Sequence, residues 1–111
     1  MKPVLTKVSV PIFGRRFIVV EYTDKSDLSS LIGGSNTTQL DAFVTYIDDD
    51  IHVFFNKTKV VNYGVIAHES KHIVNLIFKE INYLIDMDND EVECYLLGWV
   101  VNEINKVLNE K

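Results

Sequence analysis

The sequence predicts an α+β fold in which a small, mostly antiparallel sheet is followed by two long helices. Alternating polarity with β-branched and aromatic residues marks residues 1–60, whereas apolar residues recur every three or four positions in residues 61–111. The chain has 111 residues, of which 47% are hydrophobic, which is enough for one domain with its own core. We therefore expect a single domain, residues 1–111, with a β-rich half and a helical half.

The first strand is expected at residues 4–10, where Val, Thr and Val alternate with Leu, Lys and Ser until Pro11 ends the run. Gly14 and Arg15 then predict a turn. Residues 16–22 are β-branched and aromatic enough to predict a second strand.

Residues 23–39 carry many Asp, Ser, Gly and Asn, which predicts a loop with a short helical turn at residues 26–32. The two apolar runs at residues 40–47 and 51–56 flank three consecutive aspartates. This pattern predicts a β-hairpin with the aspartates at its turn.

The helical half begins at Asn62, a residue that commonly caps helix N-termini. Residues 86–90 are a polar break, and a second helix is expected at residues 91–108. Gly98 within it predicts a close approach to the first helix, and Trp99 is expected at the edge of the core. The apolar stripe of the first helix comprises Val65, Ile66, Ile73, Leu76, Ile77, Ile81 and Leu84, and that of the second Leu97, Val100, Val101, Ile104 and Leu108.

Composition excludes several classes of protein. The formal net charge is −5 and the basic residues are scattered, which argues against a nucleic-acid partner. No run approaches the roughly 18 apolar residues of a membrane span, and no secretory leader is recognisable. Cys94 is the single cysteine, has apolar neighbours and is expected to be buried. We therefore expect a cytoplasmic protein without a membrane partner; oligomeric state is not predicted.

An HExxH motif lies inside the first predicted helix, at His68, Glu69 and His72. Residues four apart lie one above the other on a helix, so both imidazoles can reach one Zn²⁺ ion. Glu69 lies beside them, where it can deprotonate a zinc-activated water as the general base. His68 and His72 are thus candidate metal ligands, and Glu69 is the candidate catalytic residue.

A catalytic zinc needs a third protein ligand. The metzincin extension is absent, because Asn75 and Phe78 stand where its Gly and third His would be. His52, the remaining histidine, lies in the hairpin and is expected to face solvent or a cleft rim. Glu91 and Glu93, early in the second helix, both have a suitable spacing for a helix that returns past the motif. Spacing alone does not decide which of the two is the third ligand.

The two helical motifs together provide a family resemblance. HExxH, followed by the segment Glu91-Val92-Glu93-Cys94-Tyr95-Leu96-Leu97-Gly98-Trp99, resembles small phage and prophage metallopeptidase-like proteins. More distantly it is similar to gluzincins, including the ImmA/IrrE group. The resemblance covers residues 65–101 and implies a minimal zincin-like domain with Glu91 as the third zinc ligand. Lys71 departs from it, because such helices usually carry uncharged residues there.

The expected function is zinc-dependent hydrolysis of a peptide bond in a peptide or protein substrate. An edge strand of the hairpin is expected to hold the substrate in extended form. Tyr83, Tyr95 or His52 could donate a hydrogen bond to the oxyanion, but the sequence does not choose among them, and each of these residue types more often has a packing role. The alternative is a zinc-stabilised binding or regulatory module, in keeping with a phage-derived protein, that has little or no turnover.

Overall fold

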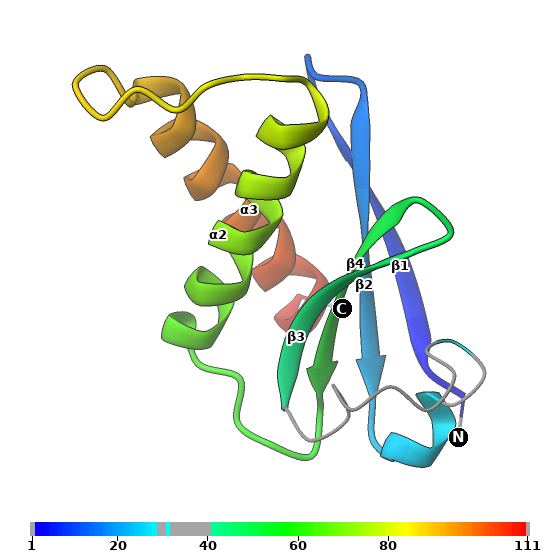
Figure 1. Ribbon diagram of the computed structural model, residues 1–111. Coiled ribbons are helices and arrows are strands. Elements are labelled where there is room, and N and C mark those ends of the chain that lie inside the picture. The colour runs from blue at the N-terminus through cyan, green and yellow to red at the C-terminus, as the bar shows by residue number, and fades with distance from the viewer. Residues whose placement is uncertain (1, 29–30, 32–40, 111) are drawn as a thin grey trace.

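The computed structural model describes residues 2–28, 31 and 41–110. Four strands form one sheet, and two helices lie against one of its faces (Figure 1). This confirms the predicted α+β class. In chain order the elements are β1 (Val4–Val10), β2 (Arg15–Tyr22), the 3₁₀-helix η1 (Lys25–Leu28), β3 (Ala42–Ile47), β4 (Asp50–Asn56), α2 (Tyr63–Glu80) and α3 (Glu91–Asn109).

The sheet has the strand order β1-β2-β4-β3. The pairs β1–β2 and β3–β4 are antiparallel, which agrees with the predicted turn after the first strand and confirms the predicted hairpin of residues 40–56. The central pair β2–β4 is parallel, with Phe17 opposite Ile51 and Tyr22 opposite Asn56, so the sheet is mixed. Local sequence patterns predict the turn between the first two strands and the hairpin of residues 40–56, but the way that one strand pair docks on the other depends on tertiary packing. This topology leaves β3 at an edge of the sheet.

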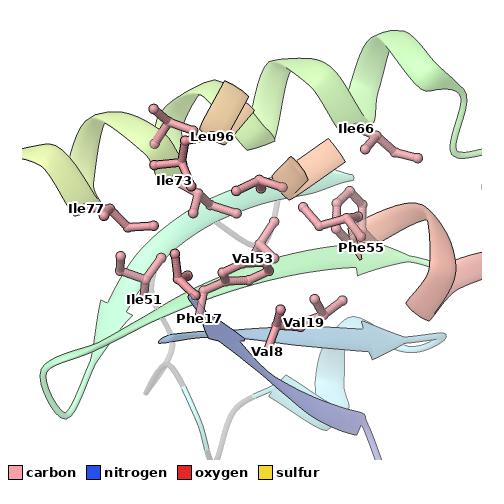
Figure 2. Close-up of a cluster of buried hydrophobic side chains, with 14 of the residues drawn as sticks. Val8, Phe17, Val19, Ile51, Val53, Phe55, Ile66, Ile73, Ile77 and Leu96 are labelled. Atoms are coloured by element: carbon pink, nitrogen blue, oxygen red, sulfur yellow. The ribbon is translucent and has the colours of Figure 1, made fainter. Parts of the chain in front are cut away.

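Side chains alternate across the central strands and bury both faces of the sheet. Phe17, Val19 and Val53 belong to the main core beneath the two helices, where Ile66 and Ile73 of α2 meet them (Figure 2). Ile18, Val20 and Phe54 point the other way and pack with Leu28 of η1 in a second cluster. The two-residue period of the strands therefore separates two cores with one sheet.

Helix α2 begins where the sequence predicts. The side chain of Asn62 accepts a hydrogen bond from the backbone N–H of Val65 at 2.9 Å, which caps the first turn. The helix ends at Glu80, and Asn82 adopts a positive φ of 58° just beyond it. The predicted apolar stripe extended to Leu84, but this residue lies outside the helix and is 88% exposed.

The predictions for the helical turn at residues 26–32, for Gly98 and for Cys94 had different outcomes. The predicted helical turn at residues 26–32 corresponds to η1, while residues 29–30 and 32–40 lie outside the described residues. The expectation for Gly98 was wrong, because a Cβ atom there would meet no atom within 4 Å. Cys94 is exposed rather than buried, since it lies on the outer side of α3.

Trp99 packs against the main core and is partly buried, as expected of a residue at the core edge. Among the described residues, no helix is both long and apolar enough to cross a membrane.

Ser70 provides a test of this packing. Its side chain is fully buried in α2, and its hydroxyl has no hydrogen-bond partner among the described residues. A buried hydroxyl without a partner destabilises the folded state, and Ala favours helix more than Ser does. We expect Ser70→Ala to raise the free energy of unfolding by about 1 kcal/mol in chemical denaturation. A loss of stability would show that the hydroxyl has a partner.

Candidate metal centre

The HExxH residues lie in the middle of α2 and point in different directions. Ile66, Ile73 and Ile77 turn one side of the helix into the core. His68 and His72 are consequently exposed, whereas Glu69 lies at the boundary and is only 6% exposed. The apolar stripe therefore sets the helix rotation that presents both imidazoles to solvent.

The two imidazoles are close enough to share one ion. Their Nε2 atoms lie 3.3 Å apart, and their ring planes are inclined by 77°. Two nitrogen ligands at about 2.05 Å from a tetrahedral zinc ion are separated by about 3.3–3.4 Å. The observed separation therefore fits a zinc ion held by both residues. It also fits a hydrogen bond between one protonated and one unprotonated ring nitrogen.

Glu69 has the burial expected of a general base. Burial raises the pKa of its carboxyl group above the ordinary value, and the nearby His68 and His72 oppose that shift. Its Oε2 atom lies 3.9 Å from Nε2 of His68. A carboxylate with a raised pKa is a stronger proton acceptor than an exposed one, and this one lies beside both candidate ligands.

A groove separates the motif from the edge strand β3. Its volume is about 380 Å³. It is lined by Ala42, Phe43 and Val44 of β3 and by His68, Glu69, His72, Asn75 and Leu76 of α2. A second hollow of about 480 Å³ continues past His68 and Glu69 toward the start of α2, with Val60, Val61 and Val65 in its wall. The HExxH residues thus lie along an open channel beside a sheet edge.

The outer edge of β3, which pairs with no further strand among the described residues, presents backbone groups to this groove. Asn56 donates its N–H to the carbonyl of Asp41, so Asn56 and Asp41 occupy a hydrogen-bonded position of the ladder between β4 and β3. In an antiparallel ladder such pairs alternate with pairs whose N–H and C=O groups point away. By this alternation the backbone groups of Ala42 and Val44 point outward from the sheet, in the strand segment that lines the groove.

The two glutamates proposed as third ligands have different surroundings. Glu93 is largely buried and forms an ion pair with Lys71 of α2. Glu91 is exposed in the first turn of α3. The helix phase therefore turns Glu93, rather than Glu91, toward the HExxH helix. Within the described ranges, no group of three or more His, Cys, Asp and Glu side chains is placed to hold a metal ion. The assignment of Glu91 stays a prediction that depends on the family resemblance.

The other sequence candidates lie away from the motif. His52 is 5% exposed and its Nδ1 lies 2.9 Å from the carbonyl oxygen of Asp50. The ring stacks on Phe54, on the face of the sheet opposite α2, so the expectation that it faces solvent or a cleft rim was wrong. The sheet also separates it from His68 and His72, which rules it out as their partner.

The two tyrosines considered for oxyanion stabilisation do not line either hollow beside the motif in the described structure. Tyr83 packs on Phe78, with ring centroids 4.6 Å apart. Tyr95 is 76% exposed on α3, where it lines a different hollow. Asn75, by contrast, lines the groove but was not predicted as a site residue from the sequence. Its position three residues after His72 on the same helix was the signal that could have indicated it.

Comparison with known proteins provides no further assignment. No protein-family model matches the chain, and neither a curated protein nor a solved structure is significantly similar to it. The class defined by this fold and motif is therefore an α+β domain with an HExxH helix at a sheet edge. A relation to zincins stays a prediction that depends on the resemblance of the motifs.

The zinc binding predicted for His68 and His72 can be measured directly. We expect His68→Ala and His72→Ala each to abolish stoichiometric zinc in mass spectrometry of the reconstituted protein, because a single imidazole cannot hold the ion. We expect Glu91→Gln to lower zinc affinity at least tenfold.

Glu93→Gln is the matched control for Glu91→Gln and should retain zinc, because Glu93 already pairs with Lys71. The reverse result for the two glutamates would make Glu93 the third ligand and would require its ion pair to open. Zinc retained by both histidine variants would contradict the site itself.

Proposed function

We propose that this protein is a zinc-dependent peptidase whose metal is held by His68 and His72. The observation that carries the proposal is the separation of 3.3 Å between the two Nε2 atoms, next to a buried Glu69 and an open groove. Zinc with fewer than four protein ligands and an adjacent carboxylate is typical of catalytic sites rather than structural ones. Glu91 is proposed as the third ligand, on the resemblance alone.

Glu69 is proposed as the general base. When bound, a zinc ion supplies a Lewis acid that lowers the pKa of water toward about 7. The carboxylate of Glu69 accepts a proton from the attacking water while the water oxygen bonds to the peptide carbonyl carbon. Glu69 then returns that proton to the departing amine as the C–N bond breaks. The raised pKa of Glu69 favours the first of these transfers.

The proposed substrate is a peptide in extended conformation. The outward backbone groups of Ala42 and Val44 can hydrogen-bond to a strand laid along β3, which gives affinity without selecting a sequence. Such a strand would lie in the groove between β3 and α2, beside Glu69 and His72. Apolar side chains of the substrate fit the walls that Ala42, Val44 and Leu76 provide.

The chemistry is tested with Glu69→Gln, which keeps the size of the side chain but removes its basicity. We expect the zinc-loaded variant to lose at least 100-fold in hydrolysis of quenched fluorescent peptides, because general base catalysis contributes about 10²–10⁴-fold. Zinc content should stay near that of the wild type.

Glu103→Gln is the matched control, since Glu103 lies on α3 and pairs with Lys106, away from the groove. Equal hydrolysis by Glu69→Gln and wild type would reject Glu69 as the base. Zinc binding without hydrolysis by the wild type would favour the alternative, a zinc-containing binding or regulatory module.

Substrate binding along β3 is tested with Val44→Pro. Proline removes the outward N–H of Val44 and leaves the hydrogen bonds between β3 and β4 in place, and edge strands tolerate proline. We expect KM for a cleaved peptide to rise at least tenfold. Val44→Ala shortens the side chain and keeps the N–H, so its KM should rise less. Equal effects of the two substitutions would show that backbone pairing does not contribute.

A cytoplasmic location is part of the proposal. It is supported by the single cysteine, Cys94, which is free and suits a reducing compartment.

A further inference from the structure

Asn75 lines the groove of the proposed peptidase but has no role in the scheme above. It lies one turn after His72 on α2, is exposed, and shares the groove wall with Glu69 and Leu76. An asparagine amide has both a hydrogen-bond acceptor and two N–H donors. Whether the amide oxygen or the NH₂ group faces the groove depends on which of the two is hydrogen-bonded to a neighbouring side chain.

Lys71 determines the orientation of this amide. Its ammonium group donates a hydrogen bond of 2.9 Å to Oδ1 of Asn75. Lysine has only donors, so the amide oxygen must be the atom that faces it. Since the amide is planar, the Nδ2 group lies on the other side and has no partner among the described residues. Its two N–H donors are therefore free for a ligand in the groove.

Glu93 holds Lys71 in this position. The ion pair between them joins α3 to α2, and the carboxylate of Glu93 is largely buried. This contact explains why a charged residue is accommodated inside the HExxH motif at position 71. The connected series Glu93, Lys71, Asn75 thus extends from the second helix to the wall of the groove.

We propose that Asn75 is a substrate-binding residue that donates hydrogen bonds from Nδ2 to a carbonyl of the bound peptide, and that Lys71 and Glu93 position its amide for this purpose. The inference rests on the proposed function, because it assigns the groove to a peptide. It adds a specific donor to the binding that the edge of β3 provides. It also assigns a role to the residues by which this helix departs from other HExxH helices.

The test uses peptide binding rather than turnover. The probe is a fluorescein-labelled peptide, Ala-Val-Ala-Leu-Val-Ala, chosen for the apolar walls of the groove, and added to the zinc-loaded Glu69→Gln protein. In that background we expect Asn75→Ala to weaken binding three- to tenfold, the usual contribution of one hydrogen bond. Asn75→Asp should weaken it at least as much, because it replaces the donor with an acceptor. Asn102→Ala, at an exposed asparagine of α3 outside the groove, is the matched control and should bind like the parent.

The positioning role is separated from a structural one by exchanging the two charges. Combining Lys71→Glu with Glu93→Lys restores an ion pair between the helices, so thermal stability should return to that of the parent. The glutamate at position 71 would now accept from Nδ2 of Asn75 and turn the amide oxygen toward the groove. Either single change breaks the ion pair. Compared with the two single variants, we therefore expect the double variant to regain thermal stability, but its peptide binding should stay weaker than that of the parent.

Full recovery of binding in the charge-exchanged protein would overturn the positioning role, and unchanged binding by Asn75→Ala would overturn the assignment of Asn75. Absence of probe binding in all variants would overturn the inference as well. Zinc content, measured in parallel, distinguishes these failures from failure of the metal centre. Zinc present with binding insensitive to Asn75 rejects this inference alone, whereas absence of zinc rejects the proposed function.

Discussion

The packing of α2 on the sheet is the interaction on which the site depends. Ile66, Ile73 and Ile77 are completely buried against β-strand residues such as Val53. Each such side chain stabilises the fold by roughly 1.5–3 kcal/mol relative to exposure. Rotating the helix by one residue would lose several of these contacts, a cost comparable to the total stability of about 5–15 kcal/mol that small domains have. Core packing therefore determines that His68 and His72 face outward beside the edge of β3.

Electrostatics then determines what the exposed side of α2 can do. Burial raises the pKa of the Glu69 carboxyl group. This group therefore accepts a proton more readily than the many solvated carboxyl groups of this acidic protein. Lys71 would otherwise place a positive charge beside the two imidazoles and oppose cation binding. Its pairing with Glu93 compensates this charge and orients Asn75 at the same time. In the proposed scheme, a single contact between α2 and α3 thus serves both the metal centre and the groove.

The sequence predicts the elements better than their arrangement. Period-two and three-to-four-residue patterns locate all four strands and both helices, because these signals are local. The parallel pairing of β2 and β4 is not predictable in this way, since Phe17 and Ile51 are brought together by long-range packing. The same limit explains the errors for His52, whose burial depends on which sheet face it occupies, and for Gly98, whose surroundings depend on the rotation of α3. HExxH spacing predicts the two facing histidines, whereas the roles proposed for Asn75 and Glu93 follow only from the contacts of Lys71.

The most direct test of the account is anomalous diffraction at the zinc absorption edge from crystals of the zinc-reconstituted protein. The account predicts one anomalous peak per chain within about 2.0–2.1 Å of both Nε2 atoms of His68 and His72. The same map would show which carboxylate completes the coordination. A peak bound by other residues, or no peak at full zinc loading, would contradict the central claim that this helix carries a catalytic zinc centre.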